Sequence, residues 1–267
     1  MIIKDGVMKV SMFGKRVIQL VICAILMVGM NTNLKAQDDS ENEPMLLSIT
    51  EFTVKMGHNL AFQEGVKSWK ECYLENDGEW TWNMWYRMNG KGTVYYLTSY
   101  SSSWAEFSAD DPAGMACYRQ AAELIMPAVE KVEDHFTWTK PEWSMTPGES
   151  QNTVVEVAFF RVKNWSLFNS LASEVMGIIE EAQGSKRSLW YESHGGGPDG
   201  FHYMNVFPYE NMEALDDPYE SAWAIVAEAE GEDTRDELLE DYRNSVENSW
   251  MYIMRLNEDM SHSGGDE

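Results

Sequence analysis

Two histidines enclose a glycine-rich stretch in which the chain comes closest to a metal or phosphate site. Residues 194–202 read HGGGPDGFH, with His194 and His202 at the two ends. Paired imidazoles are common metal ligands, and a glycine-rich turn that opens a helix can bind phosphate through backbone N–H groups. However, no third ligand stands at a suitable spacing, and the residues that follow, 201–207, are strand-like. We therefore predict a β-hairpin turn without a metal ion.

A second set of candidates combines aromatic and ionisable side chains on predicted strands. Neighbouring residues of a strand face opposite sides of its sheet, so 79–87 (EWTWNMWYR) divides into two sets. We predict that the apolar set, Trp82, Met84 and Tyr86 with Leu189 and Tyr191 of a later strand, lies under helices. The mixed set would then form the wall of a pocket. Its predicted ligand-binding members are Asn83, Trp85, Arg87, His135, Trp190, Glu192 and His194, to which Glu156 and Arg161 add.

A simpler alternative for the same residues stays open. Trp85 and Trp190 would only fill the interior, with the charged groups at its rim, because Trp and Tyr pack well between sheets. The catalytic patterns G-x-S-x-G and H-E-x-x-H are absent from the sequence, as are the glycine patterns of P-loop and dinucleotide-binding proteins. We therefore predict no catalytic residue, no metal and no cofactor.

The strands that carry these candidates belong to a pattern that occurs twice. Three landmarks recur in the same order at offsets of about 105 to 108 residues, which indicates an internal repeat. They are FTVK at 52–55 and FRVK at 160–163, Trp85-Tyr86 and Trp190-Tyr191, and Asp110-Asp111-Pro112 and Asp216-Asp217-Pro218. We predict two copies of one module, 45–143 and 153–256, joined by a Pro-, Gly- and Ser-containing linker at 144–152.

Each copy predicts the same series of elements. The β-rich runs 45–54 and 154–162 come first, and each is followed by an amphipathic helix whose apolar residues recur at helical spacing. Two more strands follow, 80–87 and 93–100 in copy one and 188–194 and 201–207 in copy two. A second helix is predicted at 113–132, with a counterpart interrupted near Gly231, before final strands at 135–140 and 250–255. The helical stripes are Phe62, Val66, Trp69 and Tyr73, and Phe168, Leu171, Val175, Ile178 and Ala182.

The order βαββαβ is that of a ferredoxin-like unit. Duplicated in one chain, it resembles the dimeric α+β barrel superfamily, which includes antibiotic-biosynthesis monooxygenase-like and stress-responsive barrel domains. The resemblance implies an α+β fold in which two tandem modules pack sheet to sheet as an intramolecular barrel. It also implies relatives that are cofactor-free monooxygenases or that handle haem. No residue of this chain matches a catalytic motif of those relatives, so no residue role is carried over.

In such a fold the two helices of a module lie side by side and run antiparallel. The resemblance therefore brings Cys72, after the first helical stripe, towards Cys117 in the second helix. This arrangement permits a disulfide, and two buried free thiols are the alternative. The second copy has neither cysteine, so a bridge would stabilise one module.

The N-terminal residues predict export. Lys9, Lys15 and Arg16 precede an apolar run at 17–30, and a small residue, Ala36, stands before Gln37. This is the pattern of a secretory signal peptide at 1–36, with an uncleaved anchor as the alternative. Cleavage would leave an acidic leader at 37–44 and a periplasmic or extracellular protein. The acidic, Gly-containing segment 257–267 predicts a disordered tail.

Net charge limits the partners. The chain has 20 Lys and Arg against 44 Asp and Glu, a formal charge of −24. Nucleic acids and anionic membranes bind cationic surfaces, so we predict neither as a partner after cleavage. We predict a monomer or weak homo-oligomer that binds a small apolar or aromatic molecule without catalysis, or that serves as a stable exported module. The alternative is an oxygenase-like or haem-handling enzyme of the same superfamily.

Overall fold

The computed structural model describes residues 43–146 and 152–264. The predicted signal peptide, residues 37–42 of the leader, residues 147–151 of the linker and residues 265–267 lie outside this part of the chain. Every helix within the described ranges is too short or too polar to cross a membrane.

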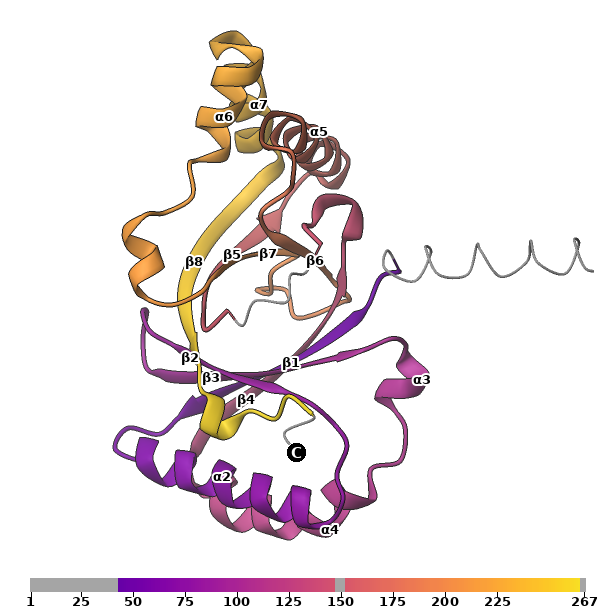
Figure 1. The fold of residues 1–267 in the computed structure, drawn as a ribbon, viewed down its shortest axis with the longest axis vertical. Helices are drawn as coiled ribbons and strands as arrows, with labels where there is room; N and C mark the ends of the chain where they lie inside the picture. Colours follow the sequence, from indigo (N-terminus) through magenta and orange to yellow (C-terminus); the bar gives the residue numbers. More distant parts are fainter. Residues whose placement is uncertain (1–42, 147–151, 265–267) are drawn as a thin grey trace, which may run out of the picture. The chain divides into compact units, whose positions relative to one another are not determined.

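Eight antiparallel strands close into a single barrel (Figure 1). Going around the barrel, each strand forms hydrogen bonds with its neighbours in the order β1-β3-β2-β8-β5-β7-β6-β4. This confirms the predicted α+β barrel class. The strands are β1 (Leu46–Val54), β2 (Asn83–Arg87), β3 (Thr93–Ser101), β4 (Val129–Thr139), β5 (Val154–Val162), β6 (Leu189–Ser193), β7 (Tyr203–Tyr209) and β8 (Val246–Leu256).

The two halves of the chain meet at strand edges. The first half contributes the order β4-β1-β3-β2 and the second half β8-β5-β7-β6. β2 pairs with β8 through Tyr86 and Arg255, and β4 pairs with β6 through Trp138 and Glu192. The prediction of two sheets packed as one barrel did not include this pairing, which closes the barrel with hydrogen bonds along both edges. Edge pairing supplies partners for backbone groups that an open sheet leaves unpaired, and it leaves an enclosed interior between the halves.

Helices cover the outside of the barrel (Figure 1). α2 (Asn59–Glu75) and α4 (Pro112–Gln120) lie against the first half, and a short α3 (Trp104–Phe107) follows β3. α5 (Trp165–Gln183), α6 (Ala222–Glu230) and α7 (Glu232–Ser245) lie on the second half. Shorter turns are η2 (Ala121–Ile125), η3 (Met126–Ala128), η4 (Pro141–Trp143), η5 (Glu213–Asp216) and η6 (Glu258–Met260).

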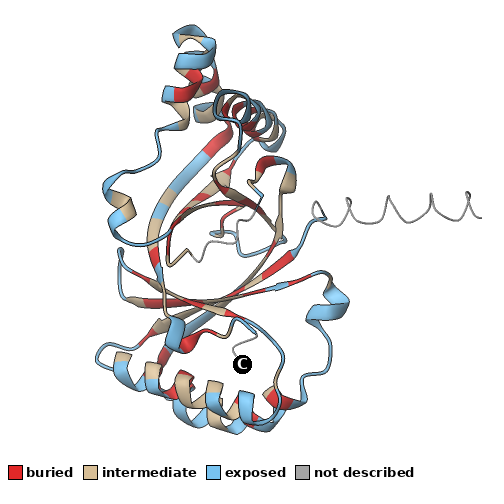
Figure 2. Ribbon diagram, in the orientation of Figure 1, coloured by how far each residue is buried: buried red, intermediate tan, exposed pale blue. Residues whose placement is uncertain are grey.

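The helices are held by apolar stripes, as predicted. α2 buries Phe62, Val66 and Tyr73 against the first-half strands, and α5 buries the first three residues of its predicted stripe, from Phe168 to Val175, in the same way. The end of that stripe is wrong, because Ile179 is buried, whereas Ile178 is half-buried and Ala182 is exposed. Buried residues form one outer core beneath the second-half helices and two clusters beneath the first-half helices, and a fourth cluster lines the barrel interior (Figure 2). Burial of apolar surface at these four places supplies the main driving force for folding.

One predicted helix is shorter than expected. Helical structure continues from α4 through η2 and η3 only to Ala128, and β4 begins at Val129. Pro127 has no backbone N–H, which weakens helical continuation at this point. Residues 129–134 instead pair with β1, where Val132 lies opposite Phe52. In the second half the predicted interruption is confirmed, because Gly231 separates α6 from α7 with a φ of +95°.

The predicted disordered tail is wrong for residues 257–264. Met260 is fully buried, the Trp82 indole donates to the Met260 carbonyl oxygen (2.7 Å), and Trp82 and His262 form a β-bridge. Lys67 of α2 forms an ion pair with Asp259. Polar composition predicted disorder, but one apolar side chain and several backbone hydrogen bonds attach this segment to the first half.

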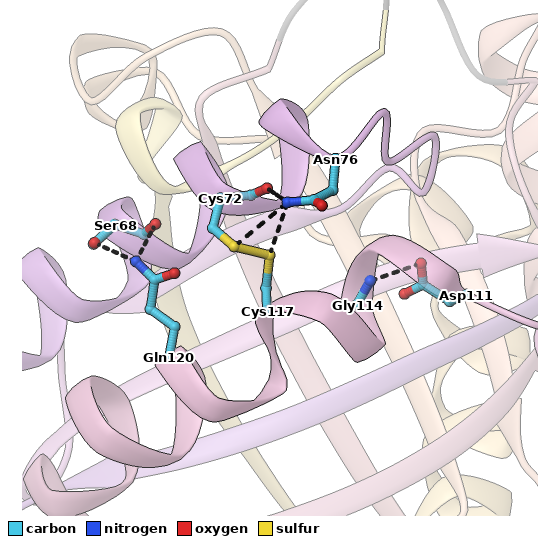
Figure 3. Close-up of a disulfide and its surroundings, with 7 residues drawn as sticks. All are labelled: Ser68, Cys72, Asn76, Asp111, Gly114, Cys117 and Gln120. Carbon is cyan, nitrogen blue, oxygen red and sulfur yellow. Dashed lines mark hydrogen bonds between the residues drawn. A yellow bond between two sulfur atoms is a disulfide. The ribbon is translucent and has the colours of Figure 1, made fainter.

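Cys72 of α2 and Cys117 of α4 are joined by a disulfide, with their Cα atoms 6.0 Å apart (Figure 3). The Gln120 side-chain amide donates to the Ser68 hydroxyl (2.7 Å), so a second contact links the same two helices. Because the bridge joins positions 45 residues apart, it restricts the unfolded chain strongly.

Candidate functional site

The barrel encloses a cavity of about 680 Å³. This volume lies in the range of small-molecule sites. All eight strands contribute to its lining, because alternate residues of each strand point inward. The β6–β7 turn, at Gly197 to Phe201, and Asn152 complete it.

The cavity has two chemically different walls. Of the described lining residues, the charged ones apart from Asp199 all come from the first half. The polar wall, as we name this surface, consists of Glu51, Asn83, Arg87, Tyr96, Thr98, Tyr100, Glu133 and His135. The apolar wall, from the second half, consists of Val155, Val157, Phe159, Leu189, Met204, Val206, Pro208, Trp250 and Met254, with Tyr252 at its edge. The first half also contributes Leu47, Ile49 and Trp85 to the lining. A ligand that fills the cavity would therefore contact mixed polar and apolar side chains on one side and mainly hydrocarbon on the other.

Strand register arranges the polar wall in two rows. In one row Glu51 of β1 stands between Tyr96 of β3 and Glu133 of β4. In the other, Ile49 stands between Thr98 and His135. Asn83 extends the second row as the partner of Thr98, and Trp85 extends the first as the partner of Tyr96. Residues far apart in sequence thus lie at the same height within the barrel.

The phenol of Tyr96 lies in a buried, charged environment. Burial raises its pKa strongly, and the Glu51 carboxylate adds to the rise, while the Arg87 guanidinium opposes it. Tyr96 therefore stays neutral at physiological pH and can donate a hydrogen bond. A neutral phenol on the cavity lining is suited to orient a polar group of a ligand.

A pair of tyrosines connects the two walls. The hydroxyl oxygens of Tyr100 (β3) and Tyr191 (β6) lie 2.5 Å apart. Tyr191 is buried, whereas Tyr100 exposes 43% of its surface. The two hydroxyls themselves are packed together, and burial raises the pKa of both. The hydroxyl pair is therefore buried, although part of the Tyr100 ring is exposed. The pair forms a fixed contact between the two halves.

Four of the seven predicted ligand-binding residues line the cavity. Asn83, Trp85 and Arg87 face inward from β2, and His135 faces inward from β4. The Trp85 indole donates to the Thr98 hydroxyl at 3.1 Å, and the His135 ring lies 5.4 Å from the ring of Phe201. The structure brings these four together with Glu51, Tyr96 and Glu133.

The other three do not line the cavity. Trp190 is buried in the second-half outer core, where its ring stacks on Phe160 at 5.5 Å. Glu192 forms an ion pair with Lys140 (3.2 Å). His194 lies beside Trp104 with 5.3 Å between ring centroids, outside the cavity lining.

The error is a shift of one residue in comparing the two copies. The partner of Trp85 on β3 is Tyr96, next to the helix-facing Tyr95, whereas on β7 the helix-facing Tyr203 is paired with Glu192. Trp85 thus corresponds in position to Tyr191, not to Trp190. Because strand faces alternate, a slip of one residue exchanges the two faces. Leu189 and Tyr191, predicted under the helices, line the cavity instead.

The HGGGPDGFH segment is a hairpin turn, as predicted, since β6 and β7 pair directly on either side of it. His202 accepts a hydrogen bond from the Val162 backbone N–H (2.9 Å) and packs on Trp165. His194 packs on Trp104, so the two imidazoles contact different partners. Within 43–146 and 152–264, no group of three or more His, Cys, Asp or Glu residues is arranged to hold a metal ion.

The sequence did not predict several residues that line the cavity. Glu51 shares a strand face with Leu47 and Ile49, and alternation along 46–54 was the signal that could have found it. Glu133 was missed because it lies between the predicted helix at 113–132 and the predicted strand at 135–140, so it was assigned to no sheet face, whereas β4 includes it. Of the two added candidates, Glu156 lies outside the cavity lining and accepts a hydrogen bond from Tyr209 (2.9 Å). Arg161 bonds to the Gly200 carbonyl oxygen (3.2 Å) in the β6–β7 turn.

No protein-family model matches the chain, and no curated protein matches it in sequence. Solved structures do share its fold. A "putative monooxygenase" from Lactobacillus acidophilus superposes with a TM-score of 0.50 at 11% identity, over 82% of this chain and 99% of that one. A protein of the same designation from Fusobacterium nucleatum gives a TM-score of 0.48 at 11% identity, over 83% and 95%. A chlorite dismutase mutant from Candidatus Nitrospira defluvii, in complex with cyanide, gives 0.48 at 8%, over 81% and 92%. At 11% identity, the likeness to the Lactobacillus acidophilus protein shows the fold alone.

Proposed function

We propose that this protein is an oxygenase-like enzyme whose barrel cavity binds a planar, largely apolar small molecule with a polar edge. The single observation that carries the proposal is the cavity itself, with a polar wall facing an apolar one. This reverses the expectation of a non-catalytic module, because the polar wall brings two carboxylates, a guanidinium and an imidazole to one cavity. The name of the Lactobacillus acidophilus protein supports the reaction class by analogy of fold alone.

The apolar wall suits a flat aromatic body. Phe159 and Trp250 stack with 5.5 Å between centroids and an interplanar angle of 11°, and Phe201 meets Phe159 edge-on at 5.0 Å. When an aromatic ring enters such a site, burial of its apolar surface stabilises the complex by about 25 cal/mol per Å². Edge-on and stacked contacts with the aromatic side chains stabilise it further. Shape and chemistry of this wall therefore favour fused or linked rings.

The polar wall supplies groups that can move a proton. His135, Glu51 and Glu133 are candidate bases, and Asn83 and Thr98 can orient a carbonyl or hydroxyl group. Removal of a proton from an acidic ring CH₂ leaves an electron-rich anion that dioxygen can oxidise. The balanced overall step converts CH₂ and O₂ into C=O and H₂O. In this proposal the protein binds the ring, holds its polar edge and accepts the proton.

Haem binding is a second candidate function for the same cavity, and the lining residues support it less well. His135 is the one histidine among the described lining residues and is the residue that would hold the iron. However, haem carries two carboxylates, and the polar wall offers two carboxylates of its own, Glu51 and Glu133, against a single guanidinium. The charges therefore fit the group poorly, and we derive no step through it.

The experiment compares a filled cavity with an empty one. Leu189→Trp places a large side chain in the cavity, and Leu60→Trp makes the same change at an exposed position of α2 (66% exposed). We expect the neutral aromatic probe N-phenyl-1-naphthylamine to bind the wild type and Leu60→Trp, and to lose affinity for Leu189→Trp. Equal binding by all three would contradict a ligand site in the barrel.

Catalysis is tested separately with anthrone, whose CH₂ flanked by two rings is acidic. We expect oxygen uptake that depends on the wild-type protein and falls in His135→Ala but not in His194→Ala. Incubation with haemin separates the second reading. A stoichiometric Soret shift that His135→Ala abolishes, with no anthrone oxidation, would replace the oxygenase proposal.

We also infer that the barrel arose as two tandem ferredoxin-like modules. The identical strand order of the halves supports this, as does a register shift at equivalent places, Thr53/Val54 and Arg161/Val162. Tyr95 and Tyr203 support it further, since each donates to an Asn of the helix covering it, at 2.8 Å in both cases. Separate expression of 45–143 and 153–256, followed by a test for co-assembly, would check the modular boundary.

Export remains our proposal for location. The signal-like sequence at 1–36 carries it, and the Cys72–Cys117 bridge supports it, because disulfides persist in oxidising compartments. Mass spectrometry of the protein recovered from its native host would test it, with a mature chain beginning at Gln37 as the expected result. Recovery of the unprocessed chain inside the cell would contradict it.

A further inference from the structure

We infer that Arg87 is an anion-binding residue of the cavity, and that the ligand carries an oxyanion such as a carboxylate or a phenolate on its polar edge. The inference rests on the proposed ligand cavity and goes beyond it by assigning the ligand a charge and a contact residue. The observations behind it are the burial, the missing partners and the surroundings of this one side chain.

Arg87 is buried without a counterion. The residue is 8% exposed, yet it lines the cavity. Its Nε atom is buried and has no hydrogen-bond partner. Across residues 43–146 and 152–264, the ion pairs within 4.0 Å do not include Arg87. A buried cation with an unused donor is costly unless some group completes its bonding.

The surrounding structure holds the guanidinium in place. Its Cζ lies 4.6 Å from the centre of the Tyr252 ring, and one Nη donates to the Lys91 carbonyl oxygen. The β2–β3 turn closes around it at Gly90, whose φ is +91°. A Cβ at Gly90 would come within 3.1 Å of Tyr252 and 3.5 Å of the Arg87 Nε. The turn thus approaches closely because this residue has no side chain, and Arg87 is fixed before any ligand arrives.

The cavity offers no other strong cation. Among the described lining residues, Arg87 is the only Lys or Arg, while Glu51, Glu133 and Asp199 are acidic. Glu51 and Arg87 both influence the Tyr96 phenol, but among the described residues no ion pair within 4.0 Å joins Glu51 to Arg87. An anionic group on the ligand would satisfy Arg87 through charge-assisted hydrogen bonds, with the neutral Tyr96 hydroxyl as a second donor.

The experiment uses two probes that share one ring system. 8-Anilino-1-naphthalenesulfonate carries a sulfonate, and N-phenyl-1-naphthylamine is its neutral analogue. Both are titrated into the full chain, as wild type, Arg87→Gln, Arg87→Lys and Arg119→Gln. Arg119 is a matched control, because its side chain is 87% exposed on α4 and its loss changes the net charge equally. Leu189→Trp confirms that each probe reports on the cavity.

We expect Arg87→Gln to weaken the anionic probe by about tenfold or more, the size of one charge-assisted hydrogen bond, and to leave the neutral probe within about twofold. Arg119→Gln should resemble the wild type for both probes, and Arg87→Lys should retain part of the anion preference. If Arg87→Gln does not fold, Arg87→Lys provides the test. Lysine lacks the planar guanidinium that can donate two parallel hydrogen bonds to an anion, so this variant should still bind the anionic probe more weakly and the neutral probe unchanged.

Two negative results are distinguishable. If the neutral probe binds in the cavity and both Arg87 variants bind the anionic probe as tightly as the wild type, the anion site is refuted and the ligand cavity stands. If neither probe binds the wild type, or Leu189→Trp leaves both unaffected, the cavity proposal fails and this inference fails with it.

Discussion

The C-terminal segment offers the sharpest test of the fold, because its sequence predicts disorder and the structure buries it. Met260→Ala removes a side chain that is fully buried beside α2 and β2. Truncation of the chain before Glu258 also removes the acceptors of two buried donors, the Trp82 indole N–H and the Met84 backbone N–H. These two perturbations separate packing from hydrogen bonding.

The expected magnitudes follow from these contacts. A buried Met→Ala change lowers the free energy of unfolding by about 2–5 kcal/mol. Each buried donor left without a partner adds about 1–3 kcal/mol in the truncated chain. The Lys67–Asp259 ion pair adds little, because the Asp259 side chain is 73% exposed. We therefore expect truncation to lower the free energy of unfolding by at least about 4 kcal/mol. This is a large share of the total, since folded domains are typically stable by about 5–15 kcal/mol.

Urea denaturation followed by tryptophan fluorescence measures both effects, with Met251→Ala as the control. Met251 lies on β8 and is 50% exposed, so its truncation should change the free energy of unfolding by less than about 1 kcal/mol. A truncated chain that unfolds at the wild-type midpoint with an unchanged m-value would show that the segment contributes nothing. The placement of Met260 in the core would then be wrong.

Three further predictions concern the disulfide, alkaline pH and strand register. Replacing Cys72 and Cys117 together by Ser should lower the free energy of unfolding by about 2–4 kcal/mol in denaturant titrations, while probe binding by the folded protein persists. Burial, reinforced by a neighbouring carboxylate, raises the pKa of Tyr209 to about 12. Stability should therefore be complete below about pH 10, where the unfolded phenol starts to ionise, and should fall as the pH rises towards 12. Tyr209→Phe should reduce that fall in midpoints measured across this range, and an identical slope would count against the pKa. Trp190→Phe should lower the melting temperature and leave the affinity for the probe within about twofold of the wild type. A loss of affinity as large as that of Leu189→Trp would show that Trp190 lines the cavity after all.

The sequence was most informative where periodicity and repetition agreed. The stripes on α2 and α5 placed both helices, and the repeated landmarks placed strands in both halves close to their observed bounds. The inward face of β2 was predicted correctly because its polar residues, Asn83 and Arg87, share one face with Trp85, while Met84 and Tyr86 occupy the other. Local pattern determines such features directly.

The errors arose where a short local match outweighed the pairing of distant strands. Trp-Tyr occurs in both copies, but the second occurrence is displaced by one position relative to the fold, and only the pairing of Tyr203 with Glu192 reveals it. Val129 and Val132 have helical spacing, yet their backbone lies in β4, which pairs with β1 in the sheet. The tail likewise gains its order from Trp82, which lies 178 residues before Met260. Such long-range partners cannot be read from a window of neighbouring residues.

The joining of both barrel halves in one polypeptide has a consequence for the evolution of specificity. A barrel assembled from two identical subunits is constrained by its two-fold axis, so every polar residue introduced on one side appears on the other as well. In a continuous chain each side mutates independently. Arg87 and Glu51 could therefore arise on one side of the cavity while the opposite side kept its hydrocarbon side chains. Under the proposed function, a ligand with two dissimilar faces would then bind in one orientation only.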